Sequence, residues 1–268
     1  MAEISASLVK ELRERTGAGM MDCKRALQET NGDMEAAIVL LREKGMANAA
    51  KRADRATTEG KVGYRLADDG SKGTMVAVGC ETEPVSNNDE FLAYAKSVLE
   101  AVESGGVGSE SSLDDVRVAL SAKLGENIAV VGGARFEAVD GARISAYAHP
   151  PANKFGALVH LRGGDDDLGR KLGMQIVSLR PRWIGREDVP GDLVTAEREI
   201  YLNSDEVLSK PEQAREKIVD GMLNKRFYGA NVLTDQEWIH DSSKTVGQAL
   251  KEAGAEVLEF ELFALSAR

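Results

Sequence analysis

Residues 61–81 read KVGYRLADDGSKGTMVAVGCE, and this stretch decides the fold. Two runs typical of strands, 61–67 and 74–81, flank the segment DDGSKG, whose aspartates and glycines favour a tight turn. Asn87, with Glu90 three residues later, forms a capping pair that predicts the start of a helix. The apolar residues of that helix recur at helical spacing: Phe91, Leu92, Ala95, Val98, Leu99 and Val102. The stretch therefore predicts a β-hairpin followed by an amphipathic helix.

The same plan occurs twice along the chain. After a loop over 104–112, a helix over 113–124 and a strand over 128–136 complete the first half. The second half offers strand RISAYAH (143–149), loop PPANK (150–154), strand FGALVHLRG (155–163) and a helix over 165–180. Near its end, apolar residues and a glycine repeat the spacing of 116–128 with one residue of slip: Val246, Ala249, Leu250, Gly254 and Val257. We expect two similar α+β subdomains, over 59–140 and 141–268, with a charged helical excursion at about 192–225 that breaks at Lys210-Pro211.

The first 45 residues favour three short helices. Ser5 is positioned to cap the first helix and Asp33 the third, which we expect to end at Gly45. Residues 46–58 are rich in Ala, Lys and Arg and predict a helical linker with a solvated face. The expected fold is thus α+β, with an N-terminal three-helix UBA-like bundle (1–45) before a core of two similar α+β subdomains that carries a helical hairpin excursion.

Composition narrows the possible functions. The 268 residues include 34 Lys and Arg against 44 Asp and Glu, a net charge of −10, which argues against direct binding of nucleic acid. Two cysteines are too few for a disulfide framework in a chain of this length. No apolar run approaches the ~20 residues of a membrane span. The first residues do not resemble a signal peptide. A cytoplasmic protein with no membrane contact is expected. We predict no cofactor or metal, because no phosphate-binding P-loop and no zinc-ligand spacing is present.

Several motifs resemble one known family. LVKELRERTGAGMMDCKRAL (8–27) is similar to the N-terminal signature of the bacterial elongation factor Ts family, and VGCETEPVSNNDEF (78–91) resembles its second signature. HDSSKTVGQALKEAGAEVLEFELFAL (240–265) resembles its C-terminal stretch, and REDVP (186–190) and KPEQAREKIVDGMLNK (210–225) also fit. The likeness covers essentially the whole chain in the same order.

The resemblance implies a guanine-nucleotide exchange factor that binds elongation factor Tu, both GDP-bound and nucleotide-free, and speeds GDP release without covalent chemistry. It implies a loop that disturbs the partner's Mg²⁺ site, here Thr82, Glu83, Pro84, Val85, Ser86 and Asn87. Glu83 and Pro84 stand where the family usually has Asp and Phe. The resemblance further implies that Met20, Met21 and His149 contact the partner, and that the helical excursion is a dimerisation-type module, which allows a homodimer or a 2:2 complex.

Two other classes of function remain open on the residues alone. The UBA-like bundle could recruit a partner to an α+β scaffold, as in an adaptor that promotes no exchange. Alternatively, Glu81, Glu83 and His149 could serve acid–base chemistry in an enzyme. An adaptor would bind elongation factor Tu without accelerating GDP release, and an enzyme would lose its activity when a single carboxylate is removed.

Overall fold

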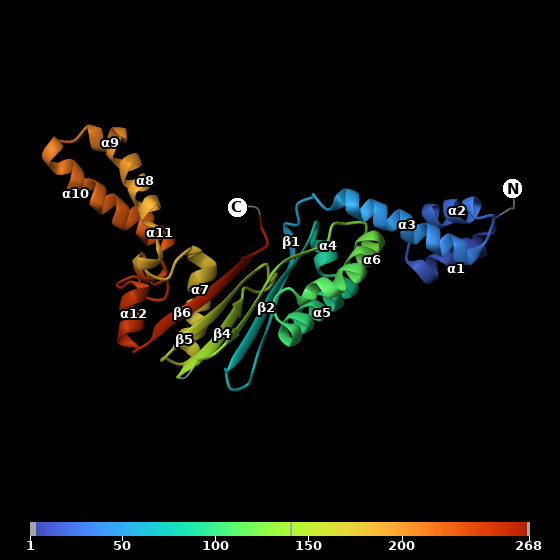
Figure 1. Cartoon of the computed structure of the whole chain (residues 1–268), viewed down its shortest axis with the longest axis horizontal. Coiled ribbons are helices and arrows are strands. Elements are labelled where there is room, and N and C mark those ends of the chain that lie inside the picture. Colours follow the sequence, from blue (N-terminus) through green and yellow to red (C-terminus); the bar gives the residue numbers. More distant parts are fainter. Residues whose placement is uncertain (1–3, 140, 267–268) are drawn as a thin grey trace.

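The computed structural model describes residues 4–139 and 141–266. Its N-terminal bundle consists of α1 (Ala6–Thr16), α2 (Met20–Glu29) and α3 (Met34–Arg52), as Figure 1 shows. The Ser5 hydroxyl accepts the Leu8 N–H and the Asp33 carboxylate accepts the Ala36 N–H, so both expected caps are confirmed. A small set of side chains fills the space between the helices: Val9, Leu12, Cys23, Ala26, Leu27 and Ala37.

The expected end of the third helix at Gly45 is wrong. Helix α3 continues through this glycine to Arg52, so the first half of the expected linker is the end of α3. A β-carbon placed on Gly45 would lie 2.7 Å from the β-carbon of Ala122 in α6 (Asp114–Leu124). Gly45 therefore allows the close approach of two helices and does not end one.

Two three-stranded antiparallel sheets form the core. The first contains β1 (Glu59–Leu66), β2 (Lys72–Cys80) and β3 (Ala129–Glu137), in that order. The second contains β4 (Ala142–Ala148), β5 (Phe155–Arg162) and β6 (Glu256–Ala264), again in chain order. In each sheet a hairpin is completed by a strand that follows intervening helices, so the predicted repetition of one plan is confirmed, and with it the α+β class.

Helices cover the outer faces of the two sheets, and the inner faces pack on each other (Figure 1). Helices α5 (Asp89–Gly105) and α6 lie on the first sheet, and α7 (Asp166–Leu179) and α12 (Val246–Glu252) lie on the second. Along β2, Val76 and Val78 contact the helical layer, whereas Met75 and Ala77 face the other sheet. Both central strands are consequently buried on two faces, which explains their continuous apolar sequences.

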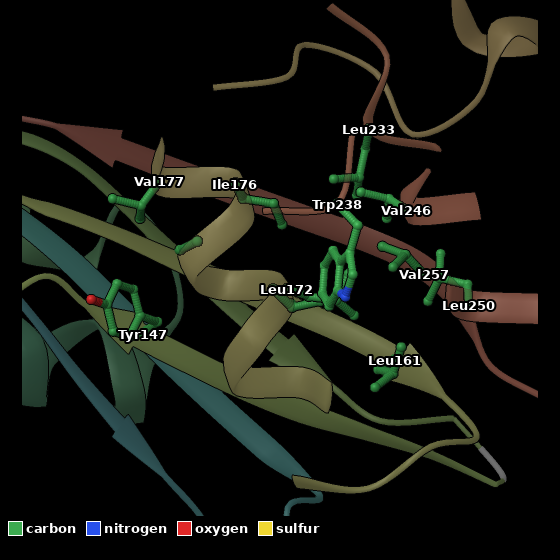
Figure 2. Close-up of a cluster of buried hydrophobic side chains, with 12 residues drawn as sticks. Tyr147, Leu161, Leu172, Ile176, Val177, Leu233, Trp238, Val246, Leu250 and Val257 are labelled. Carbon is green, nitrogen blue, oxygen red and sulfur yellow. The ribbon is translucent and has the colours of Figure 1, made fainter. Parts of the chain in front are cut away.

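A second cluster of buried side chains fixes the C-terminal segment against α7. Figure 2 shows Trp238 beside Leu172 of α7, with Val246 and Leu250 of α12 in the same cluster. The buried amide of Gln175 donates to the Gln236 side chain and accepts the Ile239 N–H at 2.9 Å. Burial of this amide costs little, because its donor and acceptor groups are both paired.

The helical excursion extends away from the sheets (Figure 1). It comprises α8 (Gly191–Leu202), α9 (Asp205–Leu208), α10 (Glu212–Met222), a π-helical turn η3 (Leu223–Tyr228) and α11 (Gly229–Asn231). The predicted break at Lys210-Pro211 is confirmed, since α9 ends at Leu208 and Pro211 precedes α10. The excursion has its own buried apolar cluster, which includes Val207, Val219 and Phe227.

Two local predictions need correction. The cap of α5 is Asn88, whose side chain accepts the N–H groups of Glu90 and Phe91, and not Asn87. The expected loop over 104–112 is only partly loop, because α5 extends to Gly105 and a 3₁₀-helix, η1, occupies Ser109–Leu113. Two further 3₁₀ turns within the described residues are η2 (Arg186–Asp188) and η4 (Leu233–Asp235).

Candidate functional site

The segment that follows β2 forms a short helix, α4 (Glu83–Ser86), with Thr82 at its N-cap position and Pro84 in its first turn. Of the six residues expected to face a partner, four are exposed: Thr82, Glu83, Pro84 and Asn87. Val85 is half-buried and packs on the core below α5, and Ser86 is 2 % exposed. Burial therefore leaves Val85 and Ser86 little surface to offer to a partner. We call residues 82–87 the α4 loop.

A carboxylate from a distant part of the chain holds the start of the α4 loop. Glu126, between α6 and β3, accepts the N–H groups of Glu81 and Thr82, each at 3.0 Å. Its other oxygen accepts the hydroxyl of Thr82. Hydrogen bonds to an ionised acceptor are about twice as strong as neutral ones, so Glu126 fixes the direction in which the loop leaves the strand.

Glu81 is itself part of a structural network. Its carboxylate accepts the Asn127 N–H at 2.7 Å and faces the guanidinium of Arg55 at 3.4 Å. The Asn127 side chain in turn donates to the backbone oxygens of Ala53 and Arg55, at 3.1 and 2.8 Å. Glu81 thus joins the segment after α3 to the end of β2, and this structural role accounts for a carboxylate at this position.

The thiol of Cys80, directly before the loop, is chemically quiet. Cys80 is buried, and its Sγ donates to the backbone oxygen of Thr82 at 3.3 Å. Burial, reinforced by the nearby negative charge of Glu126, raises the pKa of Cys80 to about 12. The group is therefore a neutral thiol at physiological pH and not a nucleophilic thiolate.

His149 occupies a turn between β4 and β5. The backbone closes this turn through the Asn153 N–H, which donates to the His149 oxygen at 2.9 Å. The Tyr147 hydroxyl lies 2.8 Å from Nδ1 of His149, and Tyr147 itself is buried. Because residues two apart along an extended chain share a face, the buried Tyr147 orients the exposed imidazole of His149. We call residues 149–153 the His149 turn.

The α4 loop and the His149 turn come from different sheets but lie at the same end of the core. The Val62 N–H of β1 donates to the Asn153 oxygen at 2.6 Å. The ammonium of Lys61 donates to the Asn87 side-chain oxygen at 2.9 Å and to the Ala152 oxygen at 3.1 Å. The structure therefore brings together two of the three expected contact regions.

Met20 and Met21 form a separate exposed patch on α2. These residues are 56 % and 63 % exposed, so both face solvent. Figure 1 places α2 and α4 at opposite ends of α3. Any partner that touches both patches must therefore span the length of that helix.

Sequence reasoning missed three residues that organise the site: Lys61, Glu126 and Asn127. Glu126 and Asn127 lie at a helix-to-strand junction, and nothing in their neighbours indicates a contact with residues 81 and 82. Lys61 alternates with buried Val62 on β1, a pattern that predicts an ordinary exposed strand residue. Only the packing of distant segments reveals these roles.

Within residues 4–139 and 141–266, no group of three or more His, Cys, Asp or Glu side chains is arranged to hold a metal ion. None of the helices in these ranges has the length and apolar character that crossing a membrane requires.

Comparison with known proteins gives a consistent result. A family model described as "Elongation factor TS" matches residues 81–267. The chain is 43 % identical to an elongation factor Ts from Thioalkalivibrio sulfidiphilus, over 96 % of this chain and 90 % of the relative. It is 38 % identical to one from Methylococcus capsulatus (97 % and 91 % covered) and 41 % identical to one from Escherichia coli (98 % and 92 % covered). The similarity to these relatives includes the N-terminal bundle, which the family model does not cover.

Proposed function

The chain belongs to the elongation factor Ts family, and on this premise we propose that it binds elongation factor Tu carrying GDP and promotes GDP release by disturbing the partner's Mg²⁺ and phosphate site. Family membership gives the coarser role, that of a translation elongation factor active in nucleotide exchange.

Exchange of this kind needs no catalytic side chain. A protein that binds the GTPase more tightly without GDP weakens GDP binding by the same factor, because the two equilibria are linked. Mg²⁺ bridges the nucleotide phosphates and neutralises their charge, so a displaced metal lowers nucleotide affinity. The factor has only to contact the partner better in the metal-displaced state than in the GDP-bound state.

The observation that carries the proposal is the construction of the α4 loop. Glu126 fixes its first residues, the Asn88 cap fixes the start of the helix that follows, Ser86 is buried, and Val85 is half-buried against the core. Pro84 and Glu83 remain exposed on this supported segment. A rigid apolar ring beside a carboxylate suits a short wedge that enters a metal site from outside.

We assign a role to each exposed residue. Pro84 acts as the wedge, with less buried area than an aromatic ring would supply, and the Glu83 carboxylate repels or competes for groups at the metal. His149 contacts the partner beside the wedge, and Met20 and Met21 pack on a second region of the GTPase domain. Homodimers or 2:2 complexes through the α8–α10 excursion, and the absence of direct nucleic-acid binding, belong to the same proposal.

Stopped-flow release of fluorescent GDP from elongation factor Tu, across a series of Mg²⁺ concentrations, tests the mechanism. We expect Pro84→Ala to slow release modestly, Pro84→Phe to accelerate it where the partner accepts a ring, and Glu83→Gln to slow it more at high Mg²⁺ than at low. Glu256→Gln, a substitution in an exposed ion pair with Arg162 at the start of β6, is the matched control. Equal rates and equal Mg²⁺ dependence for wild type, Pro84→Ala and Glu83→Gln would exclude the loop, and tight binding without faster release would identify an adaptor.

A further inference from the structure

We propose that Lys61 is a positioning residue that joins the α4 loop and the His149 turn into one rigid contact surface. This inference rests on the proposed function, since it concerns how two partner-facing segments are held. Lys61 need not touch the partner itself. Its effect on exchange passes through the two segments that it links.

The link is a continuous path of hydrogen bonds. The Lys61 ammonium donates to the Ala152 oxygen, in the His149 turn, at 3.1 Å and to Oδ1 of Asn87 at 2.9 Å. The side-chain Nδ2 of Asn87 donates in turn to the Glu83 backbone oxygen at 3.1 Å. Three bonds thus connect the His149 turn to the residue directly before Pro84. Asn87 is therefore a part of the support as well as an exposed residue.

The backbone around Lys61 brings the two sheets close enough for this path. On the edge of β1, the Val62 N–H donates to the Asn153 oxygen at 2.6 Å, and the Val62 side chain is buried between the sheets. A β-carbon on Gly156 would lie 2.6 Å from the Val62 side chain, so the glycine permits the close approach. Glu59 and Lys154 pair across the same junction at 2.7 Å. β1 belongs to the first sheet and yet supports the turn of the second.

Lysine suits this position chemically. Its ammonium carries three donors on a flexible stem and so can serve two neutral oxygen acceptors at once. Charged donors make stronger hydrogen bonds than neutral ones, and Lys61 is itself half-buried. Without the ammonium, each segment would sample more orientations, and the fraction of molecules with both segments in the binding arrangement would fall.

Two readouts test the link, and the first needs no partner. Native-state hydrogen exchange in the free protein should become faster in Lys61→Met at the Ser86 and Asn87 amides of the α4 loop and at the Asn153 amide of the His149 turn. These amides keep their own backbone acceptors, so they report the order of the segments. Lys61→Arg, which retains the charge and several donors, should restore most of the protection. Lys72→Met, at the exposed start of β2, is the control.

The second readout is coupling during exchange. With Lys61 present, Pro84→Ala and His149→Ala should have non-additive effects on the rate of GDP release, because one surface carries both residues. In a Lys61→Met background the two effects should become additive, and release should slow roughly two- to tenfold, the equivalent of one net hydrogen bond. A residue that merely stabilised the fold would leave the coupling unchanged.

The outcomes separate the link from the function. If the wild-type protein fails to accelerate GDP release, the proposed function is wrong. Amide hydrogen exchange alone then tests whether Lys61 holds the two segments together. If Lys61→Met leaves protection unchanged in either segment, or leaves the coupling intact, the link is refuted. Should Lys61→Met fail to fold, Asn87→Ala interrupts the same path at its other end, and the same two results are required of it.

Discussion

Replacement of Glu126 by alanine should release the α4 loop from the core while the rest of the protein stays folded. The carboxylate accepts two backbone N–H groups and one hydroxyl from residues 81 and 82, and it lies at the surface end of the first sheet, outside the main apolar clusters. The substitution therefore removes the support of a single loop. We expect the global free energy of unfolding to change little, while the α4 loop becomes much less ordered.

The magnitude follows from the number and kind of bonds. A hydrogen bond to a charged group contributes about 1.5–3 kcal/mol net. Glu126 accepts three such bonds, but the site is only half-buried, so water can hydrate the freed donors and offset part of the loss. We expect a local loss of roughly 2–3 kcal/mol, which corresponds to about 30- to 150-fold more frequent opening of α4. Glu126→Gln, which keeps one acceptor oxygen, should fall between wild type and Glu126→Ala.

Hydrogen exchange at the Ser86 and Asn87 amides measures this opening. These amides donate to Thr82 and Glu83 oxygens at 3.1 and 3.2 Å, within α4, and the substitution does not touch their acceptors. Stopped-flow GDP release on the same samples should slow in parallel, and Glu256→Gln serves again as the control. Unchanged exchange at Ser86 and Asn87 in a folded Glu126→Ala protein would falsify the claim that Glu126 orders the loop.

Three further predictions concern other parts of the chain. Met20→Ala combined with Met21→Ala should weaken binding to elongation factor Tu by about 2–5 kcal/mol, measured by calorimetry, with an unchanged melting temperature because both side chains are exposed; an unchanged dissociation constant rules out the contact. Because the pKa of Cys80 is raised to about 12 from 9.0, the stability that its protonated thiol contributes is present below about pH 9 and is lost as the pH rises toward 12; urea unfolding should show a slope over this range that Cys80→Ala lacks. Gly45→Ala should fail to give the gain of ~1 kcal/mol usual in a helix, and adding Ala122→Gly should recover it in thermal unfolding, unless the two helices can separate without cost.

The sequence was sufficient where local periodicity alone decides the structure. The two hairpins, the helices that follow them, the caps at Ser5 and Asp33 and the break before Pro211 all depend on residues within a few positions of each other. The repetition of the hairpin-and-helix plan was also visible, because the apolar spacing recurs. These features need no knowledge of what packs where.

The errors arose where a distant segment decides the structure. In the sequence Gly45 resembles a helix end. In the structure it lies inside α3 and packs against Ala122, a contact that no local pattern reveals. Ser86 was grouped with the exposed loop, yet α4 turns it inward, where its hydroxyl donates to the Glu83 oxygen. The supports of the site, Glu126 and Lys61, are fixed by the packing of the sheets and reach across 44 and 91 positions of sequence. Resemblance to a family could name the residues of the loop, but it could not name the side chains that hold the loop in place.

The continuity of α3 has a consequence for insertions and deletions. Leu41 packs in the N-terminal bundle, and Gly45, one helical turn later, contacts α6 on the core. One residue added between them would rotate the bundle by about 100° around the helix axis and shift it by about 1.5 Å. Met20 and Met21 would then point in a different direction relative to the α4 loop. An insertion of seven residues, close to two full turns, would nearly restore the direction but would carry the bundle about 10 Å further out. The position of the two methionines relative to the α4 loop is therefore set in angle as well as in distance, so this short interval tolerates changes of residue type far better than changes of length.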